Sequence, residues 1–127
     1  MAEIPKDLRY TKNHEWARLE GTRVVVGITD FAQSELTDIV YVEMTRAGEH
    51  VDAGDEIAVV ESVKAVSEIY APLAGRIVEY NTVLEESPET INKAPYGDGW
   101  IAMIELDGPA ELENLMSAKD YAGILEE

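Results

Sequence analysis

The chain has 127 residues, which is enough for one domain with a hydrophobic core and too few for two independent cores. Its 26 acidic and 10 basic residues give a net charge of −16, which argues against nucleic-acid or anionic-membrane partners and favours proteins with basic surfaces. The absence of cysteine excludes disulfides, thiolate metal sites and cysteine nucleophiles.

Apolar patterning and turn residues predict a series of short strands. In chain order, we expect strands at 23–27, 39–44, 57–62, 66–70, 76–81 and 100–106. Gly54, Pro72 and Gly75 mark turns between them, and residues 95–99 form a loop. Strands 57–62 and 66–70 are close enough in sequence to form a hairpin.

Helical segments are expected around these strands. Residues 29–36 have helical character, with Asp30 as N-cap and Gln33 three positions later, as in a capping box. Ser87-Pro88-Glu89 predicts the start of a short helical turn, with proline in its first turn. After Gly108 the apolar period becomes helical. The residues that indicate these C-terminal helices are Leu112, Leu115 and Met116 for the first, and Ser117 as cap with Asp120, Ile124 and Leu125 for the second.

These elements predict one antiparallel β domain spanning 1–127, with its core at about 20–107 and a helical segment at 109–126. A weak repeat divides the core. Gly54-Asp55 precedes 57–61 as Gly97-Asp98 precedes 101–105, and 39–42 resembles 77–80. Two similar halves related by a pseudo-two-fold axis are therefore expected.

The repeat is broken at one position that bears a reactive group. Lys64 lies three residues after Glu61, whereas Gly108 lies three residues after Glu105. The lysine is therefore an addition to one half rather than part of the scaffold. It stands between Val63 and Ala65 at a hairpin tip without glycine, where most turns have Asn, Gly, Asp or Ser.

The sequence around Lys64 and several motifs elsewhere in the chain resemble those of a known family. Glu61-Ser62-Val63-Lys64-Ala65 resembles the lipoyl attachment sequence, and the whole chain resembles the glycine cleavage H-protein family. The motifs that carry the second likeness are His14-Glu15-Trp16, Gly27-Ile28-Thr29, Asp38-Ile39-Val40-Tyr41-Val42, Tyr70-Ala71-Pro72, Ser87-Pro88-Glu89 and Pro95-Tyr96-Gly97-Asp98-Gly99-Trp100. The chain departs from the family at Met44-Thr45, where Leu-Pro is common, and at Ala94, where an acidic residue is common.

The resemblance implies a fold and a role. The fold is a mainly β barrel-sandwich hybrid of the lipoyl/biotinyl type, with short peripheral helices. The role is that of a carrier subunit, not an enzyme, in glycine catabolism and one-carbon metabolism. Lipoic acid is joined to Lys64 as an N6-lipoyl group, and Glu61, Val63 and Ala65 are recognised by the lipoylating enzyme.

The resemblance also implies partners. The arm takes an aminomethyl group from the PLP-dependent glycine decarboxylase (P protein) to the tetrahydrofolate-dependent aminomethyltransferase (T protein). Dihydrolipoamide dehydrogenase (L protein) then reoxidises it, and a lipoate ligase or a lipoyl/octanoyl transferase attaches it. No basic or long apolar segment indicates nucleic acid or membrane as a partner. Residues 1–6 show no targeting pattern, so we expect the protein in a prokaryotic cytoplasm. We also expect a monomer, because a shuttle that visits three enzymes gains little from burying its surface.

The loaded amine needs protection, because a neutral aminomethyl group is lost more readily than a protonated one. A nearby carboxylate raises the pKa of an amine. Glu15 in the His-Glu-Trp motif, Glu68 four residues after Lys64, and Asn13 are the candidate contacts.

Three other functions stay open at this point. A biotin carboxyl carrier shares the fold, although biotin sites usually have Met on both sides of the lysine. An H-like lipoyl carrier could serve another metabolic partner, and an unmodified interaction module could simply expose Lys64. The two histidines, His14 and His50, belong to no metal-binding motif.

Overall fold

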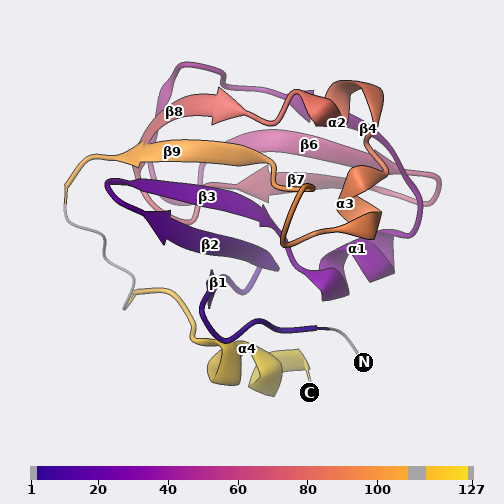
Figure 1. Ribbon diagram of the computed structural model, residues 1–127, viewed down its shortest axis with the longest axis horizontal. Coiled ribbons are helices and arrows are strands. Elements are labelled where there is room, and N and C mark those ends of the chain that lie inside the picture. Colours follow the sequence, from indigo (N-terminus) through magenta and orange to yellow (C-terminus); the bar gives the residue numbers. More distant parts are fainter. Residues whose placement is uncertain (1–2, 109–113, 126–127) are drawn as a thin grey trace.

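Figure 1 shows the computed structural model, which describes residues 3–108 and 114–125. The strands are β1 (Arg9–Tyr10), β2 (Glu15–Glu20), β3 (Arg23–Ile28), β4 (Ile39–Met44), β5 (His50–Val51), β6 (Glu56–Ser62), β7 (Val66–Tyr70), β8 (Gly75–Tyr80) and β9 (Ala102–Leu106). The helices are α1 (Asp30–Leu36), α2 (Val83–Glu86), α3 (Thr90–Lys93) and α4 (Ala118–Leu125).

Two antiparallel sheets pack against each other. One has the strand order β1-β2-β3-β9-β8-β5 and the other the order β4-β6-β7. The arrangement is a sandwich rather than a closed barrel, and α1 and α3 lie together at one end of it, while α4 lies under β1 (Figure 1). The mainly β fold with peripheral helices and a C-terminal helix is therefore confirmed.

Alternation along the small sheet explains why these segments form strands. Val42 on β4 and Val60 on β6 are opposite each other and buried between the sheets. The next residues along, Tyr41 and Glu61, pair on the outer face, where Val66 of β7 completes the row. Burial of every second residue is what a half-buried strand requires.

The predicted repeat has one copy in each sheet. The pair β4–β6 belongs to the small sheet and the pair β8–β9 to the large one. Their registers shift at matching places, between Ile39 and Tyr41 on β4 and between Ile77 and Glu79 on β8. The bulged residues, Val40 and Val78, occupy equivalent positions in the repeat. A bulge bends a strand, so both sheets curve at the same point of each half.

Several sequence-based boundaries need correction. The N-cap of α1 is Thr29, whose side chain accepts from the Ala32 amide, whereas Asp30 accepts from the Gln33 side chain at 2.7 Å. The prediction misses strands β1, β2 and β5 and helix α2. The turn predicted at 87–89 does start a helix, because α3 follows it directly.

Of the two helices expected in the C-terminal segment, the second is confirmed as α4. Ser117 precedes α4, and its hydroxyl accepts from the Asp120 amide at 3.2 Å. The helix expected around Leu115 and Met116 is wrong for those two residues, because Met116 exchanges two backbone hydrogen bonds of 2.8 Å with Tyr10. Leu112 lies outside the described residues.

A second core cluster attaches α4 to the large sheet. Tyr121 is fully buried and stacks on Tyr10 with ring centroids 4.8 Å apart. Its hydroxyl lies 2.8 Å from His14 Nδ1 and 2.7 Å from Thr29 Oγ1. No helix within the described ranges is long and apolar enough to cross a membrane.

Helix α1 ends in a strained residue. Thr37 has φ 65° and ψ −146°, a region in which side chains with a branched Cβ are disfavoured and glycine is comfortable.

Replacing Thr37 with glycine is expected to raise the free energy of unfolding by about 1 kcal/mol. Strain of this kind costs about 1–3 kcal/mol, and the greater freedom of glycine in the unfolded chain offsets about 0.5–1 kcal/mol of the gain. Urea denaturation measures the difference. Thr82→Gly is the control, because Thr82 is exposed with φ −68° and should lose stability. If the Thr37→Gly protein is no more stable than the original, the Thr37 backbone is not strained.

Candidate functional site

Lys64 lies at the tip of the β6–β7 hairpin with its side chain exposed. The Ser62 amide donates to the Ala65 carbonyl at 2.8 Å and closes the turn. Two-residue hairpins usually need residues with positive φ, and none of residues 62–66 in this described turn has one. The Ser62 hydroxyl compensates, accepting from the amides of Lys64 at 3.1 Å and Ala65 at 3.0 Å. A serine side chain therefore stabilises a turn that glycine usually forms.

The tip is also supported by the connection between α1 and β4. The Val63 amide donates to the Asp38 carbonyl at 3.0 Å. Lys64 Nζ donates to the Glu35 carbonyl at 3.1 Å, in the last turn of α1. The C-terminal end of a helix attracts cations, so the free ammonium has a favourable resting place. Val63 and Val66 on either side are 69% and 63% exposed, which leaves an apolar surface around the lysine.

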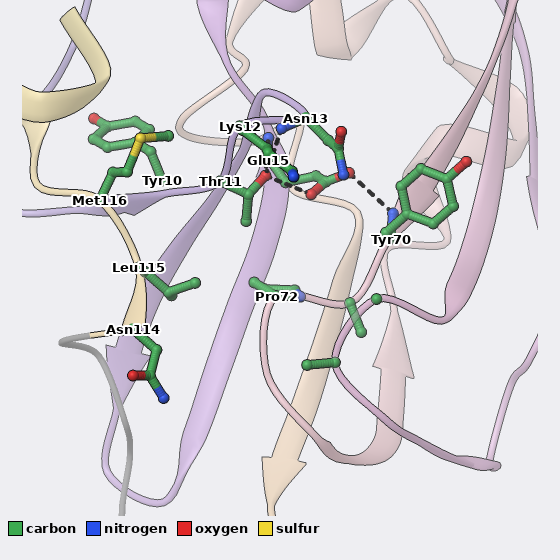
Figure 2. Close-up of a pocket in the computed structure, with 13 residues that line it drawn as sticks. Tyr10, Thr11, Lys12, Asn13, Glu15, Tyr70, Pro72, Asn114, Leu115 and Met116 are labelled. Carbon is green, nitrogen blue, oxygen red and sulfur yellow. Dashed lines mark hydrogen bonds between the residues drawn. The ribbon is translucent and has the colours of Figure 1, made fainter. Parts of the chain in front are cut away.

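A cavity of about 460 Å³ lies at the other end of β7 (Figure 2). Strand β7 begins beside the Lys64 tip and spans about 13 Å between Val66 and Tyr70 at ~3.3 Å per residue. The cavity is lined by the segment before β2, the end of β7 and the chain before α4. Its lining residues are Tyr10, Thr11, Lys12, Asn13, Glu15, Ala53, Gly54, Tyr70, Ala71, Pro72, Asn114, Leu115 and Met116.

Glu15 is the acidic group of this cavity and is 1% exposed. The Thr11 hydroxyl donates to its Oε1 at 2.6 Å, and the Tyr70 amide donates to its Oε2 at 3.0 Å (Figure 2). Burial raises the pKa of the Glu15 carboxyl, while these two hydrogen bonds oppose the shift. The site is a carboxylate held in place within a mostly apolar recess, which suits a small cationic group.

The pKa direction predicts a pH-dependent stability. Between the ordinary value of 4.5 and the raised value, the folded chain binds more protons at Glu15 than the unfolded chain. The protonated Glu15 carboxyl therefore contributes stability at low pH, and this contribution is lost as the pH rises from the ordinary pKa through the raised pKa of the folded chain. Glu15→Gln mimics the protonated carboxyl, so it is expected to be more stable than the original at neutral pH by about 0.5–2 kcal/mol.

Urea denaturation at several pH values checks this expectation. The difference in free energy of unfolding between Glu15→Gln and the original protein should disappear below about pH 4, where residue 15 is neutral in both proteins. A Glu15→Gln protein less stable than the original at neutral pH would show that the ionised carboxylate stabilises the fold.

The other predicted site residues fall into two places. Glu61, Val63 and Ala65 surround Lys64 in the hairpin. Asn13 lies beside Glu15 at the cavity. Glu68 is exposed opposite Val59 and is not among the cavity-lining residues, but it shares a face of β7 with Tyr70, which is one of them.

Sequence reasoning missed the residues that hold these groups. Thr11 and the Tyr70 amide fix Glu15, and Ser62 fixes the turn. Ser62 had a local signal, since serine hydroxyls often bond to backbone amides in turns. The pairing of Tyr70 with Glu15 joins residues far apart in sequence and had none.

The two histidines lie in separate environments. His14 contacts Tyr121, and His50 Nε2 lies 2.7 Å from Asp107 Oδ2. Across residues 3–108 and 114–125, no three His, Asp or Glu side chains are grouped as a metal site requires.

Comparison with known proteins places this geometry in a family. The family model described as glycine cleavage H-protein matches residues 8–127. The chain belongs to the glycine cleavage H-protein family.

The H-protein relatives cover nearly the whole chain. A glycine cleavage system H protein from Xylella fastidiosa is 52% identical over 127 residues, covering 99% of this chain and 97% of its own. One from an Anaeromyxobacter species is 54% identical over 125 residues, covering 98% of each. The crystal structure of an H protein from Mycobacterium marinum superposes with a TM-score of 0.87 at 40% identity, covering 98% of this chain and all of that one. The H-protein family therefore accounts for both the sequence and the sandwich fold.

Proposed function

We propose that this H-protein relative is a lipoylated carrier subunit of the glycine cleavage system, with the lipoyl group on Nζ of Lys64. One observation carries the proposal. In a chain of this family, Lys64 is exposed at the tip of a hairpin whose turn is held by Ser62 and Asp38. The ammonium is thus reachable by a modifying enzyme, and Glu61, Val63 and Ala65 form the surface that such an enzyme recognises.

The residues present fit a lipoyl arm. When bound, the group supplies a cyclic disulfide, the electron acceptor for the oxidative decarboxylation of glycine. Acylation removes the charge of Lys64 and with it the attraction to the Glu35 carbonyl, so the arm is free to move. The chain contributes tethering, which raises the effective concentration of the arm at each partner's active site.

The cavity serves to hold the cationic end of the loaded arm. Glu15 provides a carboxylate and Asn13 a polar side chain in its lining. Glu68 lies outside the lining, on the same face of β7 as Tyr70, and adds a second negative charge. A primary ammonium bound there keeps its proton because the carboxylates favour the charged form. The recess also limits access of water.

Replacing both Glu15 and Glu68 with glutamine is expected to shorten the lifetime of the loaded arm in free solution. Removing these two negative charges lowers the preference for the protonated amine about tenfold if the pKa of the amine falls by about one unit. Mass spectrometry follows the loss with time. Glu79→Gln, an exposed glutamate on β8, is the matched control and should leave the lifetime unchanged. An unchanged lifetime in the double variant would show that Glu15 and Glu68 do not protect the loaded amine.

Reconstitution tests the metabolic assignment. The lipoylated protein should support exchange of bicarbonate with the carboxyl of glycine when mixed with its cognate PLP-dependent decarboxylase. It should then pass the one-carbon unit to the tetrahydrofolate-dependent aminomethyltransferase and be reoxidised by dihydrolipoamide dehydrogenase. A lipoylated protein that fails the exchange would point to a different metabolic partner. Biotin in place of lipoate would point to a carboxyl carrier.

The carrier works as a cytoplasmic monomer. A surface that visits several enzymes in turn gains little by being buried in a stable dimer. Sedimentation of the lipoylated protein should give the mass of one chain.

A further inference from the structure

The segment that supports the lysine turn is held in a costly conformation. This segment, residues 35–39 from the last turn of α1 to the first residue of β4, is called the junction below. Its middle residue, Thr37, has φ 65° and ψ −146°, where a threonine does not rest without help. Such strain persists only where the surroundings determine the backbone, and it is concentrated at functional positions.

Asn92 of α3 supplies that help. Its Nδ2 donates to the Thr37 carbonyl at 2.8 Å and to Gln33 Oε1 at 2.9 Å. Its Oδ1 accepts from the Ile39 amide at 2.9 Å. One amide side chain therefore holds the residues on both sides of Asp38 and the helix before them. Figure 1 shows α3 directly beside α1, where this contact is made.

The junction in turn holds the lysine. The Asp38 carbonyl accepts from the Val63 amide at 3.0 Å, and the Glu35 carbonyl accepts from Lys64 Nζ at 3.1 Å. Both carbonyls belong to the junction that Asn92 fixes. A continuous set of hydrogen bonds thus runs from α3 to the turn, although Asn92 itself does not touch Lys64.

We propose that Asn92 is a positioning residue for Lys64: by locking the junction, it presents the lysine turn in the form that a lipoylating enzyme recognises. The inference rests on the proposed function of Lys64. Without the side-chain amide, Thr37 relaxes out of its strained conformation, the Asp38 carbonyl moves, and the Val63 amide loses its partner. The hairpin strands remain paired, but the tip becomes less ordered.

The test compares Asn92→Ala with a matched asparagine. The Asn81 side chain also makes three hydrogen bonds, donating to the carbonyls of Asp98 and Trp100 and accepting from the Val83 amide, but none of them leads to the lysine turn. With a lipoate ligase, lipoate and ATP, Asn92→Ala is expected to lower kcat/KM for lipoylation by about tenfold, mainly through KM, because a displaced reacting group costs this much or more. Asn81→Ala, assayed while folded, should keep the original value.

Rescue separates positioning from general damage. Glycine adopts the Thr37 backbone conformation without strain, so adding Thr37→Gly to Asn92→Ala should restore kcat/KM to within about twofold of the original. Amide hydrogen exchange gives a readout independent of the ligase. The Val63 amide should exchange faster in Asn92→Ala, while the Val60 amide within β6 should not. If Asn92→Ala does not fold, Asn92→Asp replaces it, since it keeps an acceptor for the Ile39 amide and loses only the donated bonds.

The outcomes are distinguishable. If the original protein is not lipoylated at all, the proposed function fails, whatever hydrogen exchange shows. If the original is lipoylated and Asn92→Ala matches Asn81→Ala, or if Thr37→Gly gives no rescue, the positioning role is overturned while the function of Lys64 stands.

Discussion

Lys64→Arg is expected to abolish lipoylation and, with it, all glycine–bicarbonate exchange supported by the protein. A guanidinium stays protonated near neutral pH and is not acylated by a ligase, whereas it keeps the charge and much of the length of lysine. The substitution should leave the fold unchanged, because the side chain is exposed and arginine also donates to the Glu35 carbonyl. Intact mass after incubation with ligase, lipoate and ATP measures the first effect, and the exchange assay measures the second.

Lys119→Arg is the matched control. Lys119 is exposed on α4 at the opposite side of the large sheet from the hairpin and has no role in the proposal. The Lys119→Arg protein should be lipoylated at Lys64 and support glycine–bicarbonate exchange at the original rate. Exchange that survives in the Lys64→Arg protein would mean that another group carries the chemistry.

Trp16→Ala is expected to lower the free energy of unfolding by about 3–5 kcal/mol, the usual cost of removing a large aromatic side chain from a core. Trp16 is fully buried, and its indole Nε1 donates to the Pro95 carbonyl at 2.9 Å. Gly27 lies so close to the indole that a Cβ there would approach it to 2.6 Å. The truncation would thus leave both a cavity and an unpaired carbonyl. Urea denaturation followed by circular dichroism measures the loss.

Trp100→Ala should cost less, because Trp100 is only partly buried. If both alanine variants lose a comparable free energy of unfolding, the packing described for Trp16 is contradicted. Since Glu15 precedes Trp16 on β2, the Trp16→Ala protein should also lose the ordered hydrogen bond from the Tyr70 amide.

The sequence predicts the central strands because they are rich in β-branched residues and are bounded by turn residues. In β8, Gly75 and Ile77 are buried on either side of an exposed residue, and in β4 Val42 is buried between two exposed residues after the bulge. Strand β2 lacks this alternation, since Glu15, Trp16 and Ala17 are all buried in succession. A buried glutamate followed by a tryptophan has no strand periodicity, and the reason for its burial is a recess formed by distant parts of the chain.

The candidate site likewise has a part that local sequence predicts and a part that depends on contacts between distant residues. Lys64 is recognisable from its local motif, because the turn that presents it is built by adjacent residues. The support of Glu15 by the Tyr70 amide joins residues 55 positions apart. The contact of Asn92 with Thr37 spans 55 positions as well. Near the C-terminus, backbone pairing between Met116 and Tyr10 overrides a local helical pattern. Contacts of this kind depend on the completed fold rather than on local periodicity.

The modification of Lys64 is the claim on which the functional account depends. Its most direct test is peptide mass spectrometry of the protein purified from its own cells during growth with glycine as a one-carbon source. We expect one lipoyl group, located on the peptide that contains Lys64. A chain that carries no acyl group at Lys64 under those conditions, or a biotinyl group instead, would contradict it.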